Sequence, residues 1–208
     1  CYDLAPRVFR ELGADIHVIA NEPDGYNINQ DCGTESTAAL VEAVIKHKSN
    51  AGVAFDGDGD RLVMVDEAGN LLDGDKILIL LARRRQQAGF LAGGVVGTIM
   101  SNYGCEKSLE RHGIDLYRTQ VGDRHVLEEL RSRGWCLGGE PSGHIVCFDK
   151  TTTGDGIVAA LQVLNAMVST DTVLSLLTGD LDDYPQARAN VTLALNRVGR
   201  SSVVSGAR

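Results

Sequence analysis

The stretch AGVAFDGDGDRLVMV, residues 51–65, joins two apolar runs through a loop that holds three aspartates. The runs at residues 51–55 and 62–65 predict two buried strands. Asp56, Asp58 and Asp60 alternate with glycines, which let a backbone curl tightly around a small object. Three neighbouring carboxylates repel one another, and a hard divalent cation relieves that repulsion. Mg²⁺ suits few protein carboxylates and keeps positions for water or phosphate oxygen, so we expect a magnesium site here.

Two other chemistries use aspartates at this spacing. The three aspartates and Glu67 occupy positions 1, 3, 5 and 12 of an EF-hand calcium-binding loop. That loop needs a glycine at position 6, where Arg61 stands, and helices instead of strands at its flanks. A phosphatase of the haloacid-dehalogenase type would use Asp56 as the phosphorylated nucleophile and Asp58 as the acid or base, but Asp60 occupies the position of its usual threonine. A metal-dependent sugar phosphatase stays open as an alternative, as does a non-catalytic module that binds sugar phosphate or metal.

The composition indicates a folded, mildly acidic protein. The chain has 208 residues, of which 43% are hydrophobic and 23% charged, and its formal net charge is −8. This charge disfavours nucleic-acid or anionic-membrane partners. Apolar runs are all shorter than the roughly 20 residues of a membrane span, and no signal peptide is recognisable. Because the chain opens with Cys1 inside a helix-like pattern, we expect it to be a piece of a longer protein.

Cysteine usage indicates a reducing, cytoplasmic location. The cysteines are odd in number and form no C-x-x-C pair, which argues against a zinc cluster and a disulfide framework. They are Cys1, Cys32, Cys105, Cys136 and Cys147.

Alternating helix and strand patterns around the aspartate loop predict an α/β fold. Before it we expect a helix ending at Gly13, a strand at 16–19 and a helix near 34–47. After it we expect a turn at 67–70 and a helix at about 75–89. The second half repeats the order of helix, glycine and strand, with strands at 95–99, 116–118 and 135–137 and helices at about 102–112 and 123–133. A last helix from Gly154 is expected to bury Ile157, Leu161, Leu164 and Val168.

Further polar loops follow predicted strands, where open α/β sheets place ligands. Residues 138–144, GGEPSGH, carry Glu140, Ser142 and His144 at alternate positions, which on an extended loop point the same way. A carboxylate and a hydroxyl suit neighbouring sugar hydroxyls, and His144 could add a hydrogen bond or move a proton. An ordinary glycine-rich turn is the alternative.

Two more loops precede helices. Asp123 is a natural N-cap for the helix that follows it, and Arg124 could reach a phosphate or a sugar. Lys150 and the backbone amides of residues 151–156 could hold an anion, although simple capping competes with that interpretation.

Taken in order, these loops resemble a known family. FDGDGDR at residues 55–61 and GEPSGH at 139–144 resemble the α-D-phosphohexomutases. VGDR at 121–124 and DKTTTGDG at 149–156 are most similar to the bacterial branch that interconverts glucosamine 6-phosphate and glucosamine 1-phosphate. The resemblance covers about residues 1–194.

The resemblance implies the domains and the roles of residues. It implies two similar α/β/α domains with mixed, mostly parallel sheets: a metal-binding domain at 1–92, whose N-terminal strand is missing, and a sugar-binding domain at 93–182. Residues 183–208 would start a linker to a C-terminal phosphate-binding domain, and whether the tail after Arg197 is native stays open. The roles implied are metal ligation by Asp56, Asp58 and Asp60, phosphoryl assistance by Arg61, and substrate binding by Glu140, Ser142, His144 and Arg124.

The family reaction implied is an isomerisation in which a phosphoserine and a sugar bisphosphate exchange a phosphoryl group with the help of Mg²⁺. The partner implied is a hexosamine phosphate, on a route to peptidoglycan precursors, and the exact hexose is not fixed by the aspartate loop. Neither Ser101 nor Ser142 has the surroundings of the family's phosphoserine, and the first and fourth domains of the family are unmatched. We therefore expect this chain to be inactive alone. An unpaired sheet edge could promote association, and the oligomeric state stays open.

Overall fold

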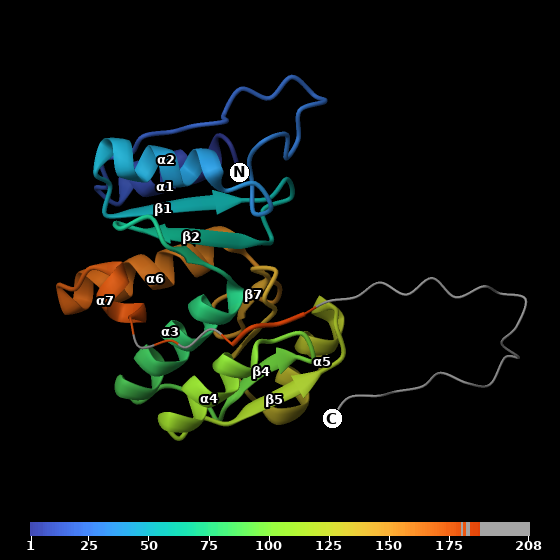
Figure 1. Cartoon of the computed structure of the whole chain (residues 1–208). Helices are drawn as coiled ribbons and strands as arrows, with labels where there is room; N and C mark the ends of the chain where they lie inside the picture. Colours follow the sequence, from blue (N-terminus) through green and yellow to red (C-terminus); the bar gives the residue numbers. More distant parts are fainter. Residues whose placement is uncertain (180, 182–183, 188–208) are drawn as a thin grey trace, which may run out of the picture.

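Two sheets organise the molecule (Figure 1), a computed structural model that describes residues 1–179, 181 and 184–187. In the first sheet the strand order is β1-β2-β3, and both pairings are antiparallel. Phe55 pairs with Leu62, so the first two strands form a hairpin whose loop is the aspartate loop. The strands are β1 Ala51–Phe55, β2 Leu62–Asp66 and β3 Leu71–Leu72.

The second sheet is mixed and mostly parallel. Its order is β5-β4-β6-β7, with β4 parallel to both of its neighbours and β7 antiparallel to β6. The strands are β4 Val95–Thr98, β5 Leu116–Thr119, β6 Leu137–Gly139 and β7 Ile145–Cys147. The carboxyl ends of β4, β5 and β6 therefore meet at one edge, and the loop after β6 is the Glu140 loop, residues 140–144.

Helices cover both sheets. In Figure 1, α1 and α2 lie along one face of the first sheet and α6 lies on the other. In the second sheet α5 packs on β4, β5 and β6, while α3 contacts β6 and α4 contacts β5. The helices are α1 Leu4–Glu11, α2 Ala38–His47, α3 Gly74–Gln87, α4 Tyr103–Arg111, α5 Asp123–Arg133, α6 Gly156–Thr170 and α7 Leu174–Thr178.

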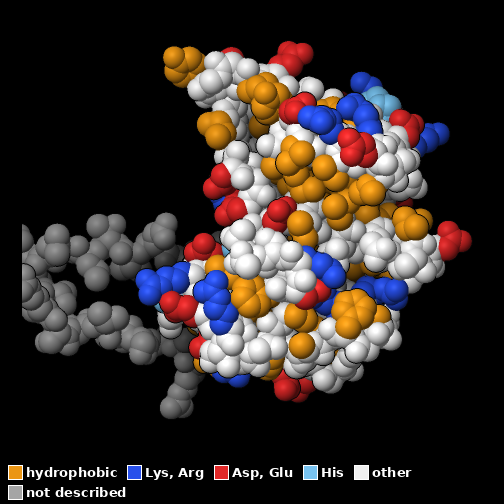
Figure 2. Space-filling model, turned by 180° about the vertical axis from the view of Figure 1, so that it is seen from behind, with side chains coloured by type: hydrophobic (Ala, Val, Ile, Leu, Met, Phe, Trp, Pro, Cys, Tyr) orange, Lys and Arg blue, Asp and Glu red, His pale blue; other side chains and the backbone are white. Residues whose placement is uncertain are grey.

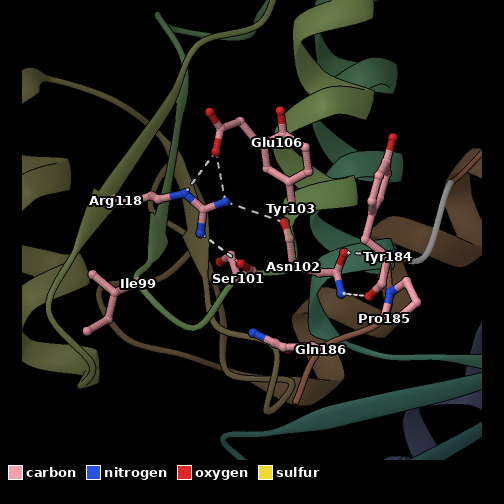
Figure 3. Close-up of a pocket in the computed structure, with 9 residues that line it drawn as sticks. All are labelled: Ile99, Ser101, Asn102, Tyr103, Glu106, Arg118, Tyr184, Pro185 and Gln186. Carbon is pink, nitrogen blue, oxygen red and sulfur yellow. Dashed lines mark hydrogen bonds and ion pairs between the residues drawn. The ribbon is translucent and has the colours of Figure 1, made fainter. Parts of the chain in front are cut away.

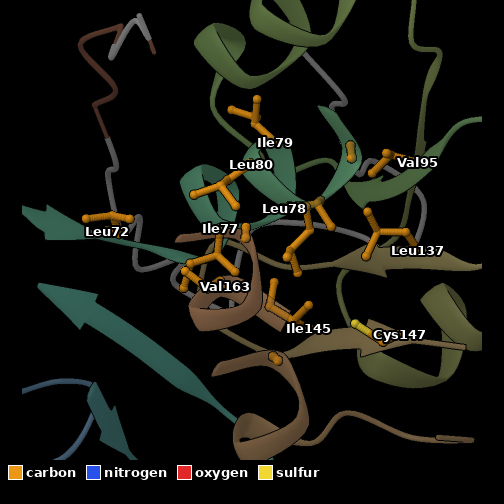
Figure 4. Close-up of a cluster of buried hydrophobic side chains, with 14 of the residues drawn as sticks. Leu72, Ile77, Leu78, Ile79, Leu80, Val95, Leu137, Ile145, Cys147 and Val163 are labelled. Carbon is orange, nitrogen blue, oxygen red and sulfur yellow. The ribbon is translucent and has the colours of Figure 1, made fainter. Parts of the chain in front are cut away.

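The main hydrophobic core lies around α3 and connects the two sheets (Figure 4). Ile77, Leu78 and Leu80 of α3 are almost fully buried against side chains of both sheets. Helix α3 also contacts α4 and α6. The helix therefore fixes the spacing between the sheets and, with it, the positions of the loops that each sheet carries.

Seen from behind, hydrophobic side chains gather across the middle of the molecule, with charged groups above and below (Figure 2). Some large hydrophobic side chains are well exposed, among them Val168 of α6 at 82% and Leu176 of α7 at 74%. Within the described residues, the helices are all too short or too polar to cross a membrane.

The α/β class is confirmed, and so is a mixed, mostly parallel sheet in the second sheet, whereas the first sheet is antiparallel because short loops connect its successive strands. The strand predicted at 16–19 is wrong, because a strand needs a hydrogen-bonded neighbour and the described residues offer it none. The predicted face of α6 is also wrong. Its buried positions are small residues and a valine, and Val168 is exposed. The buried set is Gly156, Ala159, Ala160, Val163 and Ala166.

The strands β3 and β7 and the helix α7 were not predicted from the sequence. The division between residues 92 and 93 stays a prediction. The expectation for residues 183–208 lies outside the described residues, apart from 184–187.

Candidate functional site

The three aspartates converge in the β1–β2 loop. One carboxylate oxygen from each of Asp56, Asp58 and Asp60 lies within 4.8 Å of the other two. Asp56 is buried, Asp60 is half-buried and Asp58 is exposed, so the cluster runs from the interior to the surface. Carboxylates this close need only small side-chain rotations to share one Mg²⁺ ion, whose oxygen ligands lie about 2.1 Å away. Strands instead of helices flank the loop, which excludes an EF-hand.

Arg61 holds the innermost carboxylate. Its backbone N–H donates to Asp56 Oδ1 at 3.1 Å, and its Nε donates to Asp56 Oδ2 at 2.7 Å. Burial by itself would raise the pKa of Asp56, but the hydrogen bonds and the charge of Arg61 outweigh it and lower the pKa. Asp56 is thus a fixed anion, and both of its oxygens are engaged. That engagement disfavours Asp56 as the nucleophile of a phosphatase.

Asp60 is the carboxylate most destabilised by burial and by its two charged neighbours. Burial and the charges of Asp56 and Asp58 raise its pKa. Its Oδ1 atom is buried and has no hydrogen-bond partner among the described residues, because Arg61 Nε, 3.7 Å away, donates to Asp56 instead. A buried, unsatisfied carboxylate oxygen beside two other carboxylates is the environment that a divalent cation would satisfy. The residues therefore fit the magnesium ion expected from the sequence.

The Glu140 loop docks directly on the aspartate loop. The N–H of Leu62 donates to the carbonyl of Gly143 at 3.0 Å, and Arg61 and His144 form an isolated antiparallel bridge. Gly143 has a φ of +96°, and a Cβ at this position would overlap the backbone of Leu62. On the other side, the N–H of Gly74 donates to the carbonyl of Pro141 at 3.2 Å. Glycine is thus required for this close approach of two loops from different sheets.

The alternating side chains of the Glu140 loop do not share one side. Ser142 is exposed, whereas His144 is only 3% exposed. The left-handed turn at Gly143 breaks the extended conformation on which the alternation depends. Glu140 Oε1 accepts the N–H of Gly122 at 3.0 Å, which fixes the carboxylate and ties this loop to the one after β5.

The loops before α5 and α6 differ from expectation in detail. Asp123 is not the N-cap of α5, since Gly122 occupies that position and Asp123 accepts the N–H of Arg124 at 2.6 Å. Arg124 is 81% exposed and pairs with Glu128 one turn along the helix. Lys150 pairs with Asp149 at 3.2 Å, and the cap of α6 is Asp155, which accepts the N–H of Val158.

A hollow of about 430 Å³ lies beside α4, away from the aspartate loop, and was not predicted (Figure 3). Arg118 points into it, but its guanidinium donates to Glu106 and to the carbonyls of Thr98, Ser101 and Asn102. The side chain of Asn102 exchanges two hydrogen bonds with the backbone of Tyr184, at 2.8 and 3.2 Å. The charged groups here hold the turn after β4, and no sequence motif distinguishes them beforehand.

Comparison with known proteins agrees with this geometry. Phosphoglucomutase/phosphomannomutase, alpha/beta/alpha domain III, matches residues 73–184. The phosphoglucosamine mutase of Legionella pneumophila is 54% identical over 190 residues, which are 91% of this chain and 42% of that protein. A solved phosphoglucomutase/phosphomannomutase family protein from Burkholderia thailandensis matches with a TM-score of 0.75 and 25% identity over 85% of this chain and 39% of that one.

A third relative shows the fold alone. It is the Aspergillus fumigatus N-acetylphosphoglucosamine mutase, solved in complex with GlcNAc-6P and magnesium, with a TM-score of 0.67 and 20% identity over 87% of this chain and 43% of that one. The fold and the paired loops define an α/β protein of the phosphohexomutase class. The chain belongs to the phosphoglucomutase/phosphomannomutase family. It spans about two fifths of the length of the curated relative from Legionella.

Proposed function

We propose that this chain supplies the Mg²⁺-binding and sugar-binding loops of a mutase that interconverts glucosamine 6-phosphate and glucosamine 1-phosphate. The observation that carries the proposal is the docking of the Glu140 loop on the aspartate loop, through Leu62 and Gly143 at 3.0 Å. A sugar held by one loop then places its phosphate beside the other. The 54% identity to a phosphoglucosamine mutase supports the choice of sugar.

In this proposal Asp56, Asp58 and Asp60 hold the metal. Mg²⁺, when bound, neutralises negative charge on phosphoryl oxygens during transfer. Arg61 assists the phosphoryl group, since its Nε is fixed on Asp56 and the far end of its guanidinium lies near the surface, 3.6 Å from the exposed Glu35. The side chain of Arg61 is therefore positioned before substrate arrives.

Glu140 and Ser142 would hold sugar hydroxyls. The carboxylate of Glu140 accepts, and its orientation is fixed by the N–H of Gly122. The exposed hydroxyl of Ser142 can donate or accept, so the pair can hold similar hydroxyls in the two poses that a bisphosphate intermediate needs. Arg124 would join them by breaking its ion pair with Glu128. This ion pair is exposed and contributes little stability.

We also propose that the 208 residues do not turn over substrate alone. Ser101 is 3% exposed, and its Oγ accepts the N–H of Thr98, so it is not placed as a nucleophile. Ser142 lies in the sugar-binding loop. The nucleophilic serine would come from a part of the parent protein that this chain does not match.

The test combines binding and turnover on the 208-residue chain. Calorimetry with glucosamine 6-phosphate should show binding that strengthens in Mg²⁺, and a coupled assay should show neither mutase activity nor phosphate release. Absence of binding with and without Mg²⁺ would refute the proposal. Mutase turnover would refute the inactivity, and phosphate release with label on Asp56 would favour a phosphatase.

A further inference from the structure

The side chain of His144 faces the metal loop and not the solvent. The side chain is 4% exposed, and Nε2 lies 3.7 Å from Asp60 Oδ2. A Cβ on Gly154 would overlap the ring, so this glycine encloses the imidazole on one side. The ring is thus packed into the wall of the site, although Ser142, two residues earlier, is exposed.

We infer that His144 is a positioning residue that orients Asp60 for the metal and couples metal binding to sugar-phosphate binding. The inference rests on the proposed function. It assigns to His144 an action on a metal ligand, in place of direct contact with the sugar.

The two oxygens of Asp60 have different surroundings. Oδ2 lies 3.7 Å from His144 Nε2, while Oδ1 is buried, lies 3.7 Å from Arg61 Nε and has no hydrogen-bond partner in the described part of the chain. With the imidazole beside one oxygen and Arg61 beside the other, rotation of the Asp60 carboxylate is restricted, which keeps it next to Asp56 and Asp58. Groups that orient metal ligands in this way commonly change metal affinity 10–100-fold when they are removed.

Backbone contacts also connect Asp60 to the Glu140 loop. Arg61, next to Asp60, forms a bridge with His144, and Leu62 is bonded to Gly143. The N–H of Glu140 donates to the carbonyl of His144 at 3.0 Å, which closes the Glu140 loop on itself. A displacement of Asp60 therefore reaches Glu140 through a chain of direct contacts and hydrogen bonds.

Coupling of this kind is reciprocal. If Mg²⁺ orders Asp60 and His144, and His144 orders the Glu140 loop, then Mg²⁺ tightens sugar-phosphate binding, and sugar phosphate tightens Mg²⁺ binding by the same factor. We expect a factor of about five or more in the native chain, at the lower end of typical couplings. This factor depends on the imidazole and not only on net charge.

The experiment measures Mg²⁺ affinity, and glucosamine 6-phosphate affinity with and without Mg²⁺, by calorimetry on the 208-residue chain. The variants are His144→Asn, whose short amide does not reach Asp60, and His144→Gln, whose longer amide does. Val163→Ala, a fully buried position of α6 away from the loops, controls for lost stability. Circular dichroism confirms that each variant is folded.

We expect His144→Asn to weaken Mg²⁺ binding about tenfold and to abolish the coupling factor. His144→Gln should stay within about threefold of native, and Val163→Ala should bind Mg²⁺ like the native chain. A folded His144→Asn variant with native Mg²⁺ affinity would overturn the inference, and weakened sugar-phosphate binding with native Mg²⁺ affinity would make His144 a sugar ligand instead. If the native chain binds neither ligand, the proposed function itself fails. If the native chain binds both ligands and only the role of His144 is refuted, the proposed function stands.

Discussion

Replacing Gly143 by alanine tests the docking of the two loops. Gly143 combines a φ of +96° with a position where a Cβ would overlap the backbone of Leu62. Gly113 is the matched control, because it also has a positive φ, +66°, but a Cβ there meets nothing within 4 Å. Comparison of the two alanine variants separates backbone strain, which they share, from the close approach of the loops.

The expected magnitudes follow from these surroundings. Left-handed backbone costs an L-residue about 1–2 kcal/mol, and Gly113→Ala should lose about that much. Gly143→Ala adds an overlap with backbone atoms, about 1–3 kcal/mol, and weakens the 3.0 Å hydrogen bond from Leu62, about 1 kcal/mol. We expect a total loss of about 3–6 kcal/mol.

Thermal and urea unfolding followed by circular dichroism measure the difference. For a chain of this size each kcal/mol lowers Tm by about 2–4 °C, so Gly143→Ala should melt about 10 °C below native and Gly113→Ala about 4 °C below. Equal losses in the two variants would refute the argument that Gly143 is required by the contact between loops. Gly143→Ala should also weaken Mg²⁺ binding, since the contact positions Arg61.

Two further predictions concern buried charges. Burial raises the pKa of Asp75 to about 6 from 3.8, so the folded chain keeps this proton while the unfolded chain releases it, and stability falls by up to about 3 kcal/mol as pH rises from about 4 to 6. Asp75→Asn should flatten that part of the urea-unfolding profile, and a variant as pH-sensitive as native would contradict the assignment. Arg85 is 2% exposed and donates to Asp149 Oδ1 at 2.7 Å, so Asp149→Asn should lower the free energy of unfolding by about 2 kcal/mol. In an Arg85→Met background the same substitution should lower it by less, because the buried charge is gone. Equal urea midpoints for native and Asp149→Asn would show that the pair contributes nothing.

The sequence predicted β1, β2, β4 and β5 because the signals for individual strands are local, whereas their pairing is not. Apolar runs bounded by glycine and aspartate determine β1 and β2, and the α/β alternation follows from the same patterns. Residues 16–19 carry an equally good local signal, but a strand also requires a neighbour. The face of α6 depends on its packing against α3, where small residues such as Ala159 and Ala160 permit close contact.

The clustering of the three aspartates could be predicted from the sequence, but the contacts of their loop could not. The spacing of Asp56, Asp58 and Asp60 predicts a metal loop without any structure, and their roles as ligands stay a prediction. The contact of this loop with the Glu140 loop includes the hydrogen bond between Leu62 and Gly143 and the bridge between Arg61 and His144, residues about 80 positions apart in the chain, which no local pattern encodes. The inward orientation of His144 follows from the left-handed turn at Gly143, and an alternation rule for extended chains does not anticipate it.

Calorimetric titration of the 208-residue chain with Mg²⁺, native and Asp58→Asn, is the most direct test of the metal loop. Asp58 is exposed, so its replacement leaves the fold intact, and Asp15→Asn provides an exposed control outside the cluster. We expect native and Asp15→Asn to bind one Mg²⁺ with the same affinity, and Asp58→Asn to bind at least tenfold more weakly. Equal affinities for all three proteins, or no Mg²⁺ binding by the native chain, would contradict the assignment of the aspartate loop as the metal site.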